Sequence, residues 1–225
     1  MKIMAVNVSQ ALEFEFEGRT MRSSIFKEPV NGPVALGKTS LAGDGQANLK
    51  VHGGIHKAVY AYAHDHYAWW SEALGRNDLS FGQFGENLTI SGLDEDEIFI
   101  GDCLLAGTAL TTVTGPRIPC AMLGIKFNDK TMPRRFTDAA RPGFYLRVIE
   151  TGVVEAGDAV EKIQAGEGGL SVRDLFCAYS RPRSREACDI LEHALTLADL
   201  DPDFIPRINQ RLAAFNERTG SSTTP

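Results

Sequence analysis

Short apolar segments separated by Gly, Asp, Asn and Pro make up the first 163 residues of the chain. Some alternate between apolar and polar positions and others are apolar throughout, and both patterns are typical of β-strands when turn residues bound them. The aromatic and β-branched segment AVYAY at 58–62 is the strongest of them. We predict strands at 1–9, 11–16, 33–36, 58–62, 87–90, 98–100, 103–105, 109–114, 144–149 and 159–163.

One helix is expected among these strands, over 64–74. Tyr67, Trp70 and Leu74 recur there at helical spacing, and Gly75 follows as a stop signal. Many short strands without regularly alternating helices predict a mainly β domain over 1–163 that closes, or nearly closes, as a barrel-like sheet.

The pattern becomes helical beyond a Gly-rich linker at 164–169. Ser171, Ser184 and Asp201 each precede a segment of helical periodicity, as N-capping residues do. We therefore predict a small three-helix domain over 170–217, followed by a disordered tail over 218–225. Because so short a unit buries little core by itself, it should pack on the β domain or on another subunit, and a homodimer is among the arrangements this allows.

Composition and hydropathy argue against several classes of protein for this chain. The chain has 225 residues and a formal net charge of -6, which argues against binding to a nucleic-acid polymer. It has neither a run of about 18–20 apolar residues, as a membrane helix needs, nor an N-terminal signal peptide. The expected location is the cytoplasm, with no membrane partner.

Charge is unevenly distributed along the chain. Between residues 18 and 58 there are six bases and two acids, and between 117 and 147 there are seven bases and two acids. Two cationic segments in an acidic protein indicate a local anion site, although each can also be a solvated surface.

The first basic segment contains the unusual sequence GDGQANLKVHGGIHKA at 43–58. Its glycines permit close approach of backbone N–H groups to an anion, and Lys50, His52, His56 and Lys57 add donors. It matches neither a P-loop nor a dinucleotide fingerprint. A phosphate or pterin cradle and a tight structural loop are both compatible with it.

The second basic segment begins with PRIPC at 116–120. Two prolines stiffen this loop, and Arg117 lies close to Cys120, so positive charge would favour the thiolate that attacks electrophiles or ligates a soft metal. The alternative is a buried, inert cysteine. A third segment, FGQFGENL at 81–88, contains Gln83, Glu86 and Asn87, which can position hydrogen bonds at a site or form an ordered turn.

Four of the five histidines lie between 52 and 66, but their spacing does not favour zinc. His64 and His66 would point about 200° apart on a helix, and no HExxH or CxxC motif accompanies them. The four cysteines likewise lack the spacing of a disulfide framework. We expect no zinc.

As a set, these motifs resemble the MOSC domain family, in its YiiM-like branch. The resemblance covers most of residues 1–163 and the helical segment after 170. It rests on the combination of IFKEPV at 25–30, GDGQA at 43–47, VHGG at 51–54, KAVYAY at 57–62, HY at 66–67, WW at 69–70, GQFGENL at 82–88, GD at 101–102 and PRIPC at 116–120.

The resemblance implies a β-barrel-like fold and molybdenum cofactor (molybdopterin) chemistry. The cysteine that ligates molybdenum in related proteins falls on Cys120. The implied activity is reduction of N-hydroxylated bases, such as 6-hydroxylaminopurine, to amines, with His52 or His56 as proton donor. The residues expected to hold the pterin and its phosphate are Arg22, Lys27, Lys50, His52, Lys57, Asn87 and Arg117.

The reaction needs two electrons, and the sequence carries no flavin, haem or iron–sulfur signature, so an external electron-donor protein is expected. Two alternatives stay open. One is a non-catalytic module that carries the cofactor, or a sulfur atom as a persulfide on Cys120. The other is a metal-free anion-binding protein.

The chain departs from the usual family pattern at three places. It has Ile55 and His56 where relatives usually have Pro-Asp or similar, Gly115 where they have Gln, and Ala121-Met122 where they have an aromatic-Lys pair. The last departure removes a cation beside Cys120, which we expect to weaken retention of the cofactor or to change the substrate.

Overall fold

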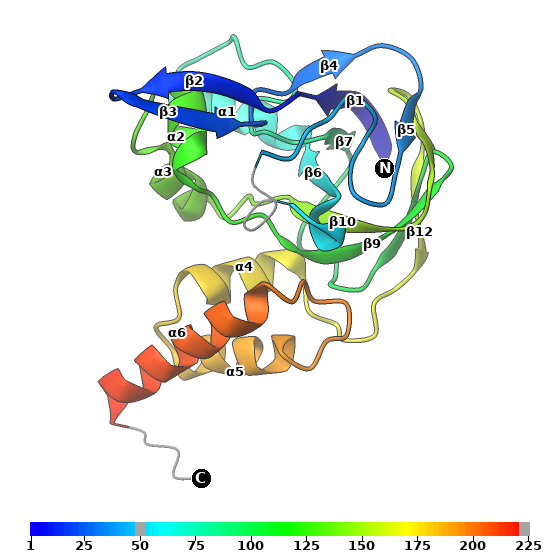
Figure 1. Cartoon of the computed structure of the whole chain (residues 1–225). Helices are drawn as coiled ribbons and strands as arrows, with labels where there is room; N and C mark the ends of the chain where they lie inside the picture. Colours follow the sequence, from blue (N-terminus) through cyan, green and yellow to red (C-terminus); the bar gives the residue numbers. More distant parts are fainter. Residues whose placement is uncertain (48–52, 221–225) are drawn as a thin grey trace.

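The computed structural model describes residues 1–47 and 53–220, which form a mixed sheet covered by helices (Figure 1). The main sheet has eight strands in the order β12-β8-β9-β10-β6-β7-β1-β4. Its pairs are antiparallel except β6 with β7. Two further ribbons pair β2 with β3 and β5 with β11. The strands are β1 (Lys2–Val8), β2 (Leu12–Phe16), β3 (Arg19–Ser23), β4 (Glu28–Val30), β5 (Val34–Leu36), β6 (Val59–Ala63), β7 (Leu88–Ser91), β8 (Cys103–Ala106), β9 (Ala109–Pro116), β10 (Phe144–Glu150), β11 (Gly152–Val154) and β12 (Val160–Gln164).

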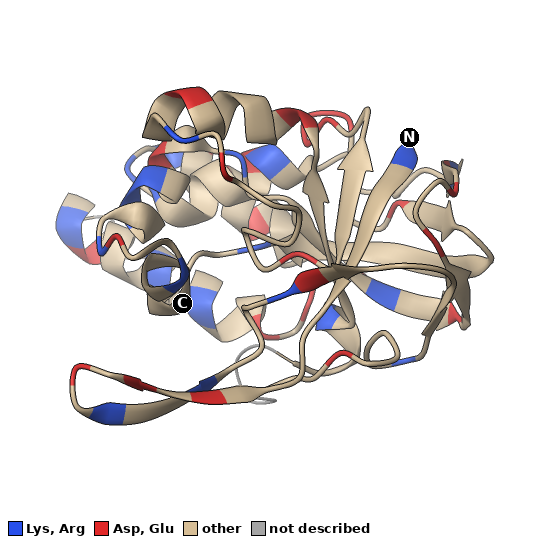
Figure 2. Cartoon of the chain, turned by 90° about the horizontal axis from the view of Figure 1, so that it is seen from above, with Lys and Arg blue, Asp and Glu red and all other residues tan. Residues whose placement is uncertain are grey.

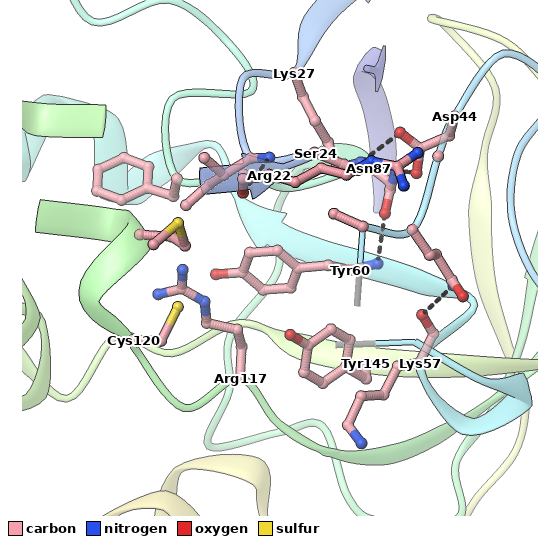
Figure 3. A pocket seen from close by; sticks show the side chains of 18 of the residues that line it. Arg22, Ser24, Lys27, Asp44, Lys57, Tyr60, Asn87, Arg117, Cys120 and Tyr145 are labelled. Carbon is pink, nitrogen blue, oxygen red and sulfur yellow. Dashed lines mark hydrogen bonds and ion pairs between the residues drawn. The ribbon is translucent and has the colours of Figure 1, made fainter. Parts of the chain in front are cut away.

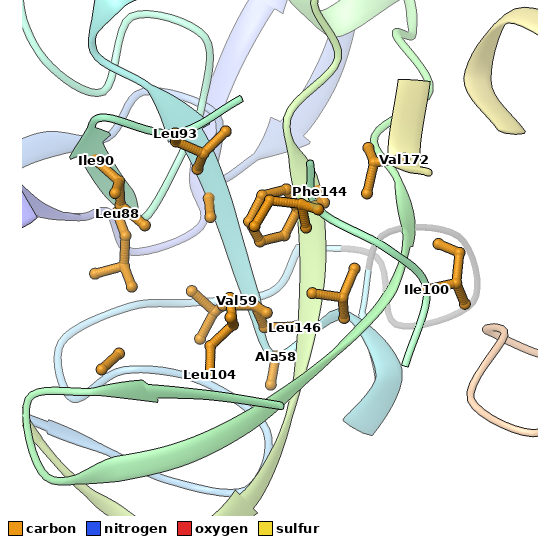
Figure 4. Close-up of a cluster of buried hydrophobic side chains, with 14 of the residues drawn as sticks. Ala58, Val59, Leu88, Ile90, Leu93, Ile100, Leu104, Phe144, Leu146 and Val172 are labelled. Atoms are coloured by element: carbon orange, nitrogen blue, oxygen red, sulfur yellow. The ribbon is translucent and has the colours of Figure 1, made fainter. Parts of the chain in front are cut away.

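Strand β6 separates two hydrophobic cores, which explains why its sequence is apolar throughout. Val59, Ala61 and Ala63 face an aliphatic core, part of which Figure 4 shows around Leu88, Leu104 and Phe144. The alternate residues Tyr60 and Tyr62 face an aromatic core beneath three helices. Because side chains alternate across a strand, one strand can contribute to both cores.

The three helices over the aromatic core are α1 (Asp65–Leu74), α2 (Ala121–Phe127) and α3 (Met132–Ala139). Helix α1 ends at Gly75 in the left-handed conformation, as predicted. Helices α2 and α3 were not predicted, because seven and eight residues carry too little periodicity. A short 3-10 helix, η1, spans Ile55–Lys57.

The expected barrel closure is wrong: the sheet is open, and within the described residues its edge strands β4 and β12 do not pair with each other. The outer side of β1 instead meets two different segments. Its second half pairs with β4, and its start bonds to the segment that leads into β12, through the bridge between Lys2 and Ala159 and the backbone bonds from Ile3 N to Asp158 O and from Val160 N to Met1 O. Strand β12 then diverges to pair with β8, so no continuous ladder joins the two ends.

One further prediction differs from the structure. Residues 98–100 are not a strand of the sheet, because their backbone bonds with the segment that leads into a C-terminal helix: Ile98 O accepts from Val172 N, and Ile100 N donates to Leu170 O. The strand predicted at 11–16 is one arm of the β2–β3 hairpin. In Figure 2 this hairpin extends away from the body of the protein, with acidic and basic residues on it, among them the cross-strand pair Glu13 and Arg22.

Three helices follow the sheet, as predicted: α4 (Val172–Ser180), α5 (Arg185–Ala194) and α6 (Phe204–Thr219). Ser171 and Ser184 cap the first two by accepting a backbone N–H. Buried residues of all three helices, such as Leu175, Leu191 and Phe204, belong to the same hydrophobic core as the sheet. These helices, which we call the helical unit, therefore pack on the β sheet.

Helix α6 extends two residues into the segment expected to be disordered. Arg218 and Thr219 are helical, and their side chains bond to the carbonyls of Ala214 and Phe215. Residues 221–225 lie outside the described residues. No helix within 1–47 and 53–220 combines the length and the apolarity needed to cross a bilayer.

Candidate functional site

A cavity of about 310 Å³ lies where the two basic segments of the chain meet (Figure 3). Five of the expected ligand residues line it together with Cys120, namely Arg22, Lys27, Lys57, Asn87 and Arg117. His56 is not among the lining residues, and Lys50 and His52 lie outside the described part of the chain. Six other residues of the lining are used in the argument below: Ser24, Asp44, Tyr60, Phe84, Met122 and Tyr145. Tyr145 lies on β10, opposite Gly115 of β9.

Cys120 reaches the cavity because strand β9 ends at Pro116 and helix α2 begins at Ala121. Cys120 is the residue before the helix, in an extended conformation, and it is partly buried. The start of the loop is fixed by a 3.3 Å bond from Arg117 N to Gly143 O. The unpredicted helix also brings Met122 to the cavity wall.

Arg117 is buried within an aromatic cage at the same end of the cavity. Its guanidinium carbon lies 5.0 Å from the ring centroid of Phe136 and 5.6 Å from that of Tyr60. Its Nη1 is buried and has no hydrogen-bond partner within the described residues. Burial raises the pKa of the adjacent Tyr145 to about 12, although the positive charge of Arg117 opposes this shift. Tyr145 therefore keeps its proton at neutral pH.

Lys27 is paired with Asp44, an acid that the sequence prediction missed. Lys27 Nζ lies 2.5 Å from Asp44 Oδ1, and both side chains are buried. Ser9 N and Asn87 Nδ2 each donate to Asp44 at 2.9 Å. Burial lowers the pKa of Lys27, and the neighbouring Asp44 limits that shift. The GDG sequence around Asp44 was the available signal, but only the fold shows its partner.

The turn at 82–88 combines a structural residue with a cavity residue. Glu86 is fully buried and accepts from Gly82 N, Phe84 N, Thr89 Oγ1 and Tyr67 OH. Asn87, the next residue, faces the cavity, and its Oδ1 accepts from Tyr60 N at 3.0 Å. Glu86 therefore orders the turn, and Asn87 lines the cavity with its amide bonded to the protein.

Lys57 is engaged by the helical unit. Its Nζ lies 2.7 Å from Asp201 Oδ2 and 2.5 Å from Asp203 Oδ2. In Figure 3 the side chain passes Tyr145, and the amino group lies away from Asp44 and Asn87. Lys57 thus borders the cavity while its charge is neutralised by two carboxylates.

Arg22 and the described histidines singled out in the sequence do not form a common site. Arg22 is exposed on β3. The His56 carbonyl accepts from Thr114 Oγ1 at 2.6 Å, and its Nδ1 is buried without a hydrogen-bond partner in the described chain. His66 bonds to Glu95 and Arg141 rather than to another histidine. Among the described residues, no three His, Cys, Asp or Glu side chains are grouped as metal ligands.

Comparisons with known proteins support the family resemblance that the sequence motifs indicate. The family model described as the MOSC domain matches residues 48–161. YflK of Bacillus subtilis is 39% identical over 171 residues, which cover 76% of this chain and 77% of YflK. A protein of Gibberella moniliformis named a reductase is 33% identical over 150 residues, 65% of this chain but only 27% of that protein. The crystal structure of YiiM from Geobacillus stearothermophilus superposes with a TM-score of 0.77 at 32% identity, covering 94% of this chain and 98% of that one.

Proposed function

The chain belongs to the MOSC domain family, and from this premise we propose that it is an oxidoreductase that holds the molybdenum cofactor and reduces N-hydroxylated compounds to amines. The reductase relative supports the general class of activity. Bases of the 6-hydroxylaminopurine type are the proposed substrates, and an external protein is the proposed electron donor.

The observation that carries the proposal is that Cys120 and Arg117 meet in one cavity. A thiolate is a suitable ligand for a soft or borderline metal. Arg117 Nη1 and Ser24 Oγ, both of residues that line the cavity, are buried polar atoms without partners in the described chain. Because buried polar groups are almost always hydrogen-bonded, these two atoms are suited to an anionic or polar ligand. The residues present therefore fit the cofactor.

Each cavity residue then has a role. Cys120 would hold the metal, and Arg117 and Ser24 would hold the pterin and its phosphate, while Asn87, whose amide already bonds to Tyr60 N, Asn7 O and Asp44, would shape the wall beside them. When bound, the cofactor supplies two-electron redox chemistry. Tyr60 and Phe84 provide apolar walls that exclude water.

Protons are needed because reduction of N–OH to N–H consumes two electrons and two protons and releases water. Lys27 Nζ can hold a proton at the cavity wall, where Asp44 orients the amino group. Its pKa, lowered by burial, lies closer to neutrality than that of an exposed lysine, which favours proton donation. The two electrons come from the external donor protein.

The test is the molybdenum and pterin content of protein purified from a host that makes the cofactor. We expect both in the wild type and in Cys103→Ala, a control cysteine on β8 that does not line the cavity, and neither in Cys120→Ala. Loaded protein should then reduce 6-hydroxylaminopurine with a chemical reductant. Folded wild-type protein without molybdenum, from a competent host, would refute the proposal.

A carrier function is the second candidate, and the ion pairs of Lys27 and Lys57 favour it. Two of the cations expected to hold a phosphate are already paired with the protein's own carboxylates. This pairing would weaken retention and permit exchange of the cofactor. A carrier would transfer cofactor to an apo-enzyme without turning over the N-hydroxylated substrate.

A further inference from the structure

The turn that leads into α6 contacts the wall of the cavity from outside. Asp201 and Asp203 hold Lys57 Nζ, as described above. Asp201 N also donates to Thr114 O at 2.9 Å, two residues before the end of β9. Asp201 is 3% exposed, so its carboxylate is buried at this contact. One turn of the helical unit is thus bound both to a cavity residue and to the strand that leads to Cys120.

A second contact lies one residue further along β9. A Cβ atom on Gly115 would come within 2.9 Å of Cε2 of Phe204, the first residue of α6. The ring of Phe204 is 4% exposed and packs edge-on against Tyr179 of α4, with 5.2 Å between the ring centroids. The phenyl ring therefore fills the space that any side chain at 115 would need. The backbone just before the Pro116–Cys120 loop rests directly on this ring.

The charge of the turn also extends into the cavity. Burial is the main cause that raises the pKa of Tyr145, and the negative charge of Asp201 adds to the shift. The positive charge of Arg117, which lines the cavity together with Cys120, acts on the same tyrosine. Asp201 is therefore coupled to the cavity by packing and by charge.

We propose that the turn at 201–203 and Phe204 are positioning elements of the cavity, so that the helical unit holds in place the loop that carries Cys120. In this role Asp201 and Asp203 fix Lys57 against the wall, and Phe204 fixes the end of β9. The inference rests on the proposed function only in taking Cys120 as the working group of the site.

The test measures alkylation of Cys120 by iodoacetamide, quantified by peptide mass spectrometry, in protein made without cofactor. Asp201→Asn keeps the shape of the side chain but removes the charge that pairs with Lys57. The matched control is Asp199→Asn, which breaks the 2.7 Å ion pair between Asp199 and Arg147. This ion pair also joins the helical part of the chain to the sheet, but neither of its residues lines the cavity. Cys188, buried on α5, is alkylated in the same sample only when the protein opens, and so reports general loosening.

We expect Asp201→Asn to raise the alkylation rate of Cys120 about tenfold, the effect of losing one charge-assisted contact, with the rate of Cys188 unchanged. Asp199→Asn should change neither rate. In Asp201→Asn/Asp203→Asn the effect should be larger, because Lys57 is left buried without a counter-charge, and adding Lys57→Met should reverse part of it.

Two outcomes would overturn the inference. One is a Cys120 rate in Asp201→Asn equal to that of the Asp199→Asn control. The other is a parallel rise at Cys120 and the buried Cys188, which would mean that the variant loosens the whole protein. Because the protein carries no cofactor in this experiment, neither result depends on whether the molybdenum proposal holds.

Discussion

The guanidinium of Arg117 lies over the ring of Phe136, with 5.0 Å between the guanidinium carbon and the ring centroid. A planar cation on an aromatic face has its N–H groups directed outward in the plane, and here Nη1 has no hydrogen-bond partner among residues 1–47 and 53–220. The rings of Phe136 and Tyr60 thus hold the guanidinium in place at the cavity wall. This relationship separates Arg117 from Lys27 and Lys57, whose charges the protein itself satisfies.

Arg117→Lys should therefore impair ligand binding although the charge is kept. A lysine cannot stack flat or donate in a fixed plane, so we expect a loss of about 1.5–3 kcal/mol of binding free energy, the value of a hydrogen bond to a charged group. The measurement is the molybdenum and pterin content after purification. Arg141→Lys is the matched control, since Arg141 stacks on Trp69 at 4.8 Å outside the cavity. Equal cofactor content in the two variants would contradict the assignment.

Lys126 makes the free energy of unfolding depend on pH, and the sign of this dependence follows from its lowered pKa. Burial lowers the pKa of Lys126 to about 8, from 10.5 for the unfolded chain. Between these values the unfolded state binds a proton that the folded state lacks, so the free energy of unfolding rises with pH. Tyr145 has the opposite effect on stability above pH 10. Because burial raises its pKa from 10.0 to about 12, the folded state keeps a proton that the unfolded state loses, and the free energy of unfolding falls as the pH rises.

We therefore expect stability to increase by about 2 kcal/mol between pH 8 and pH 10 and to fall above pH 10. Urea unfolding at a series of pH values measures this. Lys126→Met should flatten the rise, which leaves the contribution of Lys27, whose pKa burial also lowers. Lys130→Met, at an exposed position, should keep the slope. A slope unchanged in Lys126→Met would show that Lys126 is not its source.

Gly115 and Phe204 should behave as a coupled pair. Gly115→Ala inserts a methyl group 2.9 Å from the buried ring, which should cost about 1–3 kcal/mol by overpacking. Phe204→Leu opens space and should cost a similar amount alone, but the double variant should be more stable than the sum of the two changes predicts. Urea unfolding of the four proteins measures the coupling. Strict additivity would show that the two residues do not compete for space.

The contact between Gly115 and Phe204 also bears on the position where the family resemblance indicates a Gln in relatives. A Gln at position 115 has no room while Phe204 occupies its present place. The helical unit and the Cys120 loop are therefore adapted to each other in this chain.

The sequence predicted what short-range patterns determine. Strand β6 is recognisable because its two faces enter two cores, and the caps at Ser171 and Ser184 follow from local chemistry. The barrel closure was wrong because it depends on how distant edges meet. The sequence also could not predict which carboxylates pair with the cations of the site, since Asp203 lies 146 residues from Lys57 along the chain. Charge counts located the basic segments, but only the fold shows which charges are already paired.

Met122 offers the last prediction, because it lines the cavity where the family pattern has a lysine. Its thioether contributes apolar contact but no charge, so the anion contacts at this end fall to Arg117. Met122→Lys should strengthen retention of an anionic cofactor by about 1 kcal/mol, the value of a modest, partly solvated ion pair. Molybdenum that remains after prolonged dialysis measures it, and the dissociation rate should fall about fivefold. Met4→Lys, at an exposed position on β1, is the control for added charge. Faster loss from Met122→Lys would mean that the methionine itself packs on the cofactor, and that its apolar contact outweighs the missing charge.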